Sequence, residues 1–332
     1  MLPTYLPSHS FCPKRLNPGF NNWLGHLPFA RDLIGSLRPS TLVELGVHYG
    51  ESYFGFCQSM VEGSVQCTCH AVDTWKGDEH AGFYGEAVFA EVQEYNQKHY
   101  APFSNLLRMT FDQAAANFED SCLDMLHIDG LHTYDAVAHD VNTWFPKLRP
   151  GGVLLLHDVE VRQDGFEVWR LWNELQAKFP TFTFPHHAGL GVLRKPGSSE
   201  KCDDFLAELL QAGPEEQEDV RRYYVCCAKW LVRLTDEATR CRTLQELLAE
   251  KERLFTDADT KLREKTAKAA HYANLLGEME QKFLDAEARL NRKVSEANDL
   301  RQRVRAMEDS LSWRWTAPVR RLLRGSGNRE TK

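Results

Sequence analysis

Two short stretches carry the side chains best suited to chemistry. Residues 128–132 read Ile-Asp-Gly-Leu-His and residues 157–158 read His-Asp, and each stretch ends or follows a compact apolar run. Carboxylates and imidazoles can ligate a divalent metal, and an imidazole can also act as a general base because it titrates near working pH. Asp129, His132, His157 and Asp158 are therefore the first candidates for a catalytic cluster.

A third stretch has the form of a ligand-binding turn. An apolar run that contains Glu44 is followed by Gly46 and Gly50, and a helical pattern begins at Ser52. Glycine has no side chain and tolerates positive φ, so a ligand can approach such a turn closely. The two glycines lack the three-glycine spacing of a dinucleotide site, which disfavours a nicotinamide cofactor.

These residues need a sheet whose strands end at one edge. Apolar runs alternate with helical patterns, which predicts an α/β fold with a doubly wound, mostly parallel sheet. The predicted parallel strands are 42–45, 67–72, 106–109, 123–128 and 153–156. Two further runs, Thr181–Phe184 and Gly191–Leu193, are close enough to form a hairpin and would complete seven strands. Open parallel sheets bind ligands at the carboxyl ends of their strands, where Asp73, Asp129 and Asp158 stand.

Two flanking segments would enclose this edge. Residues 21–37 have the apolar pattern of an amphipathic helix that covers the sheet. The loop Lys76–Gly85 is long for a connection between a strand and a helix, so we expect it to act as a lid over the site.

Composition and charge exclude several classes of protein. The net charge of −7 gives no reason to expect nucleic acid as a partner. No run is apolar enough to cross a bilayer, and residues 1–20 lack a signal-peptide core. Cys67 and Cys69 have no second pair at zinc-binding spacing, so we interpret the cysteines as structural thiols of a cytoplasmic protein.

The composition changes after Lys195 and becomes rich in charged, helix-favouring residues. A heptad series is formed by Leu276, Phe283, Leu290, Ala297, Val304 and Leu311. A second series, Met279, Ala286, Leu300 and Met307, is interrupted at Lys293. This seam predicts a long α-helical, left-handed coiled coil and therefore a homo-oligomer. The predicted segments are an arm (1–20), the sheet domain (21–195), a linker and helical segment (196–240), the coiled coil (241–311) and a basic Trp/Arg tail (312–332).

Taken together, the motifs resemble a class I S-adenosylmethionine-dependent methyltransferase over about residues 21–195. The likeness rests on Val43–Gly50, Asp73, Ile128–Tyr134 and Leu148–Asp158, and is closest to the bacterial branch that includes macrocin-type sugar O-methyltransferases. Residues 312–318, Ser-Trp-Arg-Trp-Thr-Ala-Pro, resemble tails that follow coiled coils in surface-polysaccharide glycosyltransferases and associated methyltransferases. A basic segment with tryptophans suits an anionic membrane face, so a peripheral membrane position or a glycosyltransferase partner is expected.

The resemblance implies a site for S-adenosylmethionine as cofactor. Its methionine part would be held by the backbone around Gly46, with Glu44 behind it, and Gly50 and Asp129 would also belong to the cofactor site. Asp73 would accept hydrogen bonds from the ribose hydroxyls. Asp112 fits the adenine side of such a fold, although the same residue could simply cap a helix.

The resemblance also implies that carboxylates after the fourth and fifth strands bind magnesium. Asp129 and Asp158 match those positions, but His157 stands where a second acid is expected, so the metal set becomes Asp129, His157 and Asp158 and allows manganese, iron or zinc. A sugar hydroxyl is too weak an acid to ionise unaided, so a metal or a base must help. A metal-free mechanism would use His132 or His157 as the base, with Asp129 beside it.

The expected function is O-methylation of a sugar hydroxyl in a bacterial surface glycan or its precursor. Two alternatives stay open at this point. The chain could methylate a small molecule such as an antibiotic, or it could be a non-catalytic coiled-coil scaffold with a degenerate methyltransferase domain.

Overall fold

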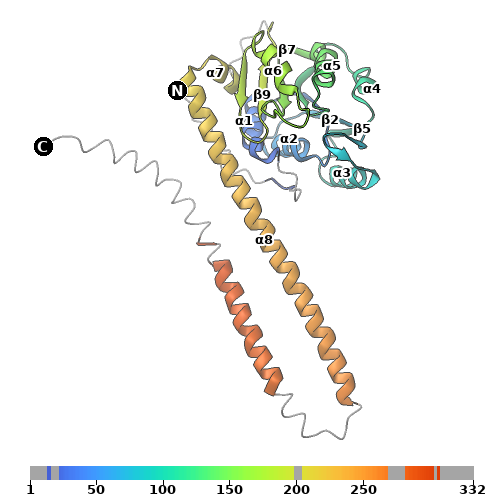
Figure 1. Cartoon of the computed structure of the whole chain (residues 1–332), viewed down its shortest axis with the longest axis vertical. Helices are drawn as coiled ribbons and strands as arrows, with labels where there is room; N and C mark the ends of the chain where they lie inside the picture. Colours follow the sequence, from blue (N-terminus) through green and yellow to red (C-terminus); the bar gives the residue numbers. More distant parts are fainter. Residues whose placement is uncertain (1–12, 16–21, 198–203, 268–280, 303–304, 307–332) are drawn as a thin grey trace, which may run out of the picture. The chain divides into compact units, whose positions relative to one another are not determined.

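The chain divides into two compact units, Met1–Thr243 and Leu244–Lys332, and each is described by itself. The structure is a computed structural model, and it describes residues 13–15, 22–197, 204–267, 281–302 and 305–306 (Figure 1). Among the helices in these ranges, none is both long enough and apolar enough to span a lipid bilayer.

A seven-stranded sheet is built from the described residues of the first unit, in the order β5-β2-β1-β6-β7-β9-β8. Five strands run parallel to their neighbours, and β9 runs antiparallel to both β7 and β8. Their bounds are β1 (Thr41–Leu45), β2 (Thr68–Asp73), β5 (Ser104–Arg108), β6 (Leu123–Ile128), β7 (Leu148–His157), β8 (Thr181–Phe184) and β9 (Leu190–Arg194). The prediction of a mostly parallel sheet closed by a hairpin is confirmed.

Helices cover both faces of the sheet, because alternate residues of the buried strands face opposite ways. Leu42 of β1 packs with the helices η2, α1, α2 and α3, whereas its neighbour Val43 packs with α4, α5 and α6. The helices are η2 (Leu24–His26), α1 (Leu27–Leu37), α2 (Glu51–Glu62), α3 (Glu86–His99), α4 (Phe111–Ala115), α5 (Tyr134–Trp144), η3 (Phe145–Lys147) and α6 (Val168–Gln176). The strand order reverses between β1 and β6, and a doubly wound sheet opens its ligand crevice at that point.

The loop expected to act as a lid has structure of its own. It forms a small antiparallel hairpin of β3 (Gly77–Asp78) and β4 (Gly82–Phe83) between β2 and α3.

The region beyond the predicted linker adds to the same hydrophobic core. Helix α7 (Phe205–Gln211) is followed by α8 (Pro214–Ala267), whose first turns bury Val220, Tyr224 and Leu231. The Tyr224 hydroxyl donates a hydrogen bond to Asp32 of α1 over 2.8 Å. The chain therefore continues as part of the first compact unit to Thr243.

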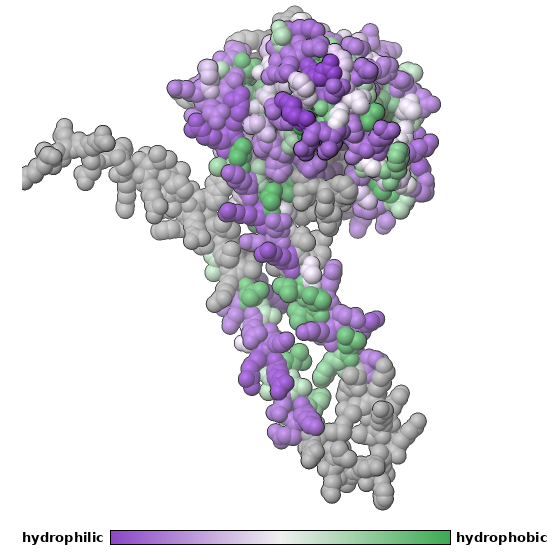
Figure 2. All heavy atoms as spheres, viewed as in Figure 1, coloured by the Kyte–Doolittle hydropathy of each residue, from purple (hydrophilic) through white to green (hydrophobic). Residues whose placement is uncertain are grey.

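The second unit is helical where it is described, in α8 beyond Leu244 and over residues 281–302. Large apolar side chains are exposed on both helices, at Leu244, Leu247, Leu248, Leu254, Phe255, Phe283, Leu284, Leu290, Val294 and Leu300 (green in Figure 2). The rings of Phe255 and Phe283 lie 6.3 Å apart. The coiled coil stays a prediction, and its positions 276, 279, 304, 307 and 311 lie outside the described residues, as do the tail 312–332 and most of the arm 1–20.

Candidate active site

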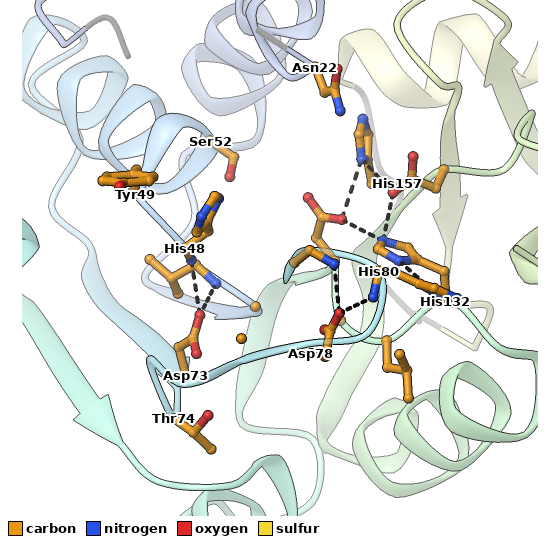
Figure 3. A pocket seen from close by; sticks show the side chains of 18 of the residues that line it. Asn22, His48, Tyr49, Ser52, Asp73, Thr74, Asp78, His80, His132 and His157 are labelled. Atoms are coloured by element: carbon orange, nitrogen blue, oxygen red, sulfur yellow. Dashed lines mark hydrogen bonds and ion pairs between the residues drawn. The ribbon is translucent and has the colours of Figure 1, made fainter. Parts of the chain in front are cut away.

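A cavity of about 460 Å³ opens at the carboxyl ends of β1, β2, β6 and β7. Its wall is formed by the turn 46–49, by Asp73 and Thr74, by residues 129–132 and by His157 with Asp158. Residues of the β3–β4 hairpin and residues 22–23 also line the cavity (Figure 3). The cavity therefore lies where the sheet topology places a ligand.

The turn after β1 can be made only with glycine at its first position. Gly46 has φ +84°, and a Cβ built on it would lie 1.9 Å from the carbonyl oxygen of Asp129. Its N–H donates a hydrogen bond to the carbonyl of Val72, which ties the turn to β2. The backbone of the turn is thus exposed to the cavity with no side chain in between.

Asp73 holds this turn from the end of β2. One carboxylate oxygen accepts hydrogen bonds from the N–H groups of Val47 and His48, each over 2.9 Å, and the other accepts from the N–H of Trp75. The hydroxyl of Tyr84 also hydrogen-bonds Asp73, so a ligand hydroxyl would have to take the place of Tyr84 or share the carboxylate with it. Asp73 lies in the cavity wall as predicted, and its structural role was not foreseen.

Glu44 and Gly50, both predicted to belong to the cofactor site, are not among the residues that line the cavity, and Glu44 lies behind the turn as expected. Glu44 is fully buried, and burial raises the pKa of its carboxyl group. It accepts a 2.7 Å hydrogen bond from the hydroxyl of Ser52, which does line the cavity. Gly50 is the N-cap of α2 with φ +78°. Both residues therefore support the wall from behind.

Asp112 is also displaced from its predicted position. Its carboxylate lies at the surface, 2.7 Å from Nε2 of His139, and outside the cavity wall. Thr110 takes the capping role, since its side chain accepts from the N–H of Gln113 and Gln113 bonds back to Thr110. Thr110 and Phe111 line the cavity instead.

The four candidate catalytic residues come together on the opposite wall. Nε2 of His132 lies 2.8 Å from Oδ2 of Asp158 and 3.6 Å from Oδ1 of Asp129. Nδ1 of His157 lies 3.2 Å from Asp158 and 3.4 Å from Asp129. Each imidazole thus lies within 3.6 Å of both carboxylates.

The backbone positions this cluster from the ends of two neighbouring strands. The N–H of Asp129 donates to the carbonyl of Leu45, and Asp158 has a left-handed φ of +60° directly after β7. Such a conformation is uncommon outside glycine and is concentrated at functional sites. Nε2 of His157 lies 3.2 Å from the carbonyl of His187, where it donates, so Nδ1 is the atom that faces the carboxylates.

Charge coupling sets the protonation states of the cluster. Burial opposes the charged forms, but the imidazoles of His157 and His132 hold the pKa of Asp129 well below its ordinary value and lower that of Asp158. Burial likewise opposes a charged His132, yet the two carboxylates raise its pKa to about 9 and raise that of His157 well above its ordinary value. Two negative and two positive groups therefore balance at neutral pH.

The same donor set fits a divalent cation. One ligand atom each from Asp129, His132 and Asp158 can be chosen so that all lie within 4.8 Å of one another. The predicted set had His157 in place of His132, and the structure brings both imidazoles to the carboxylates. Carboxylate oxygens alone would suit magnesium, but a donor set that also contains an imidazole nitrogen suits manganese, iron or zinc better.

Sequence reasoning missed Glu51 as a cavity residue. One of its carboxylate oxygens accepts from the N–H of Trp23, and the other is buried without a hydrogen-bond partner. Burial raises its pKa to about 7. Its place directly after Gly50, at the start of a helix beside a ligand-binding turn, was the signal that could have identified it.

Three comparisons place these observations among known proteins. Residues 43–159 match a family described as a methyltransferase domain. An uncharacterized protein of Sinorhizobium fredii, y4gI, is 53% identical over 171 residues, which cover 52% of this chain and 19% of that protein. This chain thus spans about a fifth of the length of that curated relative.

Solved structures give weaker likenesses. A putative caffeoyl-CoA O-methyltransferase from Staphylococcus aureus is 16% identical, with a TM-score of 0.42 over 51% of this chain and 82% of the other. A methyltransferase from Podospora anserina, solved with S-adenosylhomocysteine, is 13% identical, with a TM-score of 0.41 over 52% and 78%. An O-methyltransferase family protein from Burkholderia thailandensis is 13% identical, with a TM-score of 0.41 over 54% and 57%.

The match over residues 43–159 begins within β1, runs past the end of β7 and contains the turn, Asp73 and the four clustered residues Asp129, His132, His157 and Asp158. The match to a methyltransferase family agrees with the resemblance found in the sequence.

Proposed function

We propose that this chain is an S-adenosylmethionine-dependent O-methyltransferase that acts on a sugar hydroxyl of a bacterial surface glycan or its precursor. The observation that carries this proposal is the arrangement of one cavity, with a glycine turn on one wall and two carboxylates with two imidazoles on the other. A methyl donor and an acceptor oxygen can meet between these walls.

The cofactor side fits S-adenosylmethionine. A side chain at Gly46 would collide with the backbone of Asp129, so the turn packs this closely only with glycine, and Ser52 also lines the cavity. The methionine part would bind there, and Asp73 would accept from a ribose hydroxyl at the position that Tyr84 contacts. Thr110 and Phe111 would border the adenine in place of Asp112.

The acceptor side fits a divalent cation that would be held by Asp129, Asp158 and Nδ1 of His157, which leaves Nε2 of His132 for proton transfer. Such an ion supplies Lewis acidity, which lowers the pKa of a bound hydroxyl. Positive charge between the carboxylates would also offset the field that raises the pKa of His132 to about 9.

The reaction then requires one proton transfer and one displacement. Nε2 of His132 faces the space between Asp129 and Asp158 and accepts the proton of the acceptor hydroxyl. The acceptor oxygen bonds to the methyl carbon as the carbon–sulfur bond breaks, and S-adenosylhomocysteine leaves. Asp158 stabilises the imidazolium of His132 that forms.

The glycan acceptor and the cellular setting are inferred from sequence patterns beyond the domain. The heptad seam supports a homo-oligomer, and the tail 312–332 supports attachment to an anionic cytoplasmic membrane face or to a glycosyltransferase.

A gene deletion tests this function. We expect the surface glycan of a deletion strain to lose one methyl group per repeat, as measured by mass spectrometry, and the wild-type gene to restore it. An Asp158→Asn gene is the matched control and should not restore it. An unchanged glycan, together with labelled methyl recovered in a small molecule, would show that the acceptor proposed is wrong.

A further inference from the structure

We propose that His80, in the β3–β4 hairpin, is a positioning residue that orients the imidazole of His132. The inference rests on the proposed function, in which Nε2 of His132 receives the acceptor proton. Nδ1 of His80 lies 3.3 Å from Nδ1 of His132, on the side of that ring that faces away from the carboxylates. His132 is thus held from both of its nitrogens.

Phe166 fixes this pair of imidazoles from one face. The His132 ring stacks on Phe166 with centroids 4.2 Å apart and an interplanar angle of 13°, and the His80 ring stacks on it at 4.6 Å and 19°. The imidazoles themselves are 5.4 Å apart and inclined by 26°. The two rings therefore lie side by side on one phenyl face, in the arrangement that a hydrogen bond between their edges requires.

The direction of this hydrogen bond follows from which nitrogen of His132 faces the carboxylates. Nε2 faces Asp129 and Asp158, and an imidazole that accepts a proton at Nε2 carries its own proton on Nδ1, so the Nδ1–H of His132 donates. Nδ1 of His80 is then the acceptor. The bond keeps Nε2 of His132 turned toward the cavity, whereas a flipped ring would present carbon to the carboxylates.

The hairpin is built to deliver His80 to this point. Asp78 accepts hydrogen bonds from the N–H groups of His80 and Ala81, over 2.8 and 2.7 Å, which closes the turn. Gly77 has φ +75°, and a Cβ on it would lie 2.0 Å from the carbonyl oxygen of Gly82. Figure 3 shows Asp78 at the base of this turn and His80 directed from it toward His132.

His132 is anchored independently from its other side. Its carbonyl accepts a 2.8 Å hydrogen bond from the N–H of Glu167, the residue after Phe166. Its backbone is therefore fixed by the segment that supplies the phenyl ring, and its ring orientation is fixed by the hairpin. The hairpin and the segment 166–167 therefore act together to set the position of His132.

Two substitutions at position 80 separate the hydrogen bond from the stacking. His80→Asn keeps an acceptor at the place of Nδ1, and His80→Phe keeps an aromatic ring on Phe166 without any acceptor. His99→Asn, on the exposed end of α3, is the matched control for a change from histidine to asparagine. All variants are made in the full chain.

The first readout is independent of turnover. In protein labelled with nitrogen-15 at histidine, we expect the Nδ1 and Nε2 resonances of His132 to be displaced in His80→Phe and to stay near their wild-type positions in His80→Asn and His99→Asn. The second readout is methyl transfer from S-adenosylmethionine to surface glycan extracted from a deletion strain. We expect kcat to fall by about 10- to 100-fold in His80→Phe, and by much less in His80→Asn, with unchanged affinity for S-adenosylhomocysteine.

Unchanged His132 resonances in His80→Phe would overturn the inference, and so would equal losses of kcat in the Asn and Phe variants. Failure of the proposed function looks different, because it would appear as a wild-type chain that binds no S-adenosylhomocysteine. The His132 resonances of the variants are compared with those of the wild type without any ligand, so they test the inference whatever the cofactor result. The two proposals can therefore fail separately.

Discussion

At the scale of single residues, the main feature of the site is its charge balance. Asp129 and Asp158 lie within ion-pair distance of His132 and His157, and the pKa values of all four groups are displaced toward their charged forms. Groups with displaced pKa values in a cavity are candidates for proton transfer and metal binding. All four could be predicted from the sequence, because each lies at the end of a predicted strand or within four residues after it.

Removing one charge from this cluster should abolish turnover without loss of the cofactor. Asp158→Asn retains a residue that tolerates φ near +60° and removes one carboxylate. We expect methyl transfer to fall by at least about 100-fold, because several kcal/mol of charge stabilisation are lost. Asp158→Ala should act the same way. Calorimetry should show nearly unchanged affinity for S-adenosylhomocysteine, and wild-type turnover in either variant would remove Asp158 from the mechanism.

Metal removal should change both the rate and its pH dependence. Excess chelator should suppress transfer, and added Mn²⁺ should restore it. In chelated enzyme the residual rate should rise as pH increases through about 9, because His132 accepts a proton only after it has lost its own. Full activity in excess chelator at neutral pH would discard the metal and leave the histidines alone as the catalytic groups.

At the scale of elements, the ends of strands were predictable and the details of the turns were not. The apolar runs marked β1, β2, β6 and β7, so Asp73, Asp129 and Asp158 were correctly placed at one edge. Side-chain direction within a turn depends on φ and on neighbouring strands, which a single sequence does not reveal. For that reason Glu44 lies behind Ser52, and Asp112 lies past the cap that Thr110 forms.

The turn at Gly46 gives an element-scale test with an internal control. In Gly46→Ala the new Cβ would meet the backbone oxygen of Asp129 at 1.9 Å, so we expect lower stability and loss of S-adenosylhomocysteine binding. Gly35→Ala in α1 meets nothing within 4 Å and should stabilise the protein by roughly 0.5–1 kcal/mol. Urea unfolding and calorimetry measure both variants. Wild-type binding in Gly46→Ala would show that the turn does not hold the cofactor.

At the scale of the whole molecule, a buried group of histidines links the helices before β1 to the loop before β9. Nε2 of His26 lies 3.1 Å from the carbonyl of His187, and Nε2 of His186 lies 3.3 Å from that of Gly25. Nδ1 of both His26 and His186 is buried without a hydrogen-bond partner. Neutral imidazoles are therefore part of the packing between these helices and the loop before β9.

These histidines should make the fold sensitive to acid. Burial lowers the pKa of His26 well below its ordinary 6.5, and burial lowers that of His186 to about 4. The unfolded chain binds these protons first, so stability is complete above pH 6.5 and is lost as pH falls toward 4. Urea unfolding across this range should show the loss, and His186→Gln should lessen it because glutamine keeps a donor and does not titrate. A pH-independent free energy of unfolding would contradict this.

The predicted coiled coil belongs to the same scale. Phe283 and Leu290 are 45% and 44% exposed on the helix 281–302, at positions of the heptad seam. Light scattering should give an oligomer for the wild-type chain and a smaller species for Leu290→Glu. Asn291→Glu adds the same side chain at an exposed position that faces away from the seam, and is the control. Equal masses for all three would rule out this seam as the contact.

The account depends most on the claim that the cavity beside Gly46 binds the methyl donor. Calorimetric titration of the wild-type chain with S-adenosylhomocysteine tests it directly. We expect a single saturable site, with the binding heat lost in Gly46→Ala and kept in Asp158→Asn. No binding heat at millimolar ligand would contradict the claim.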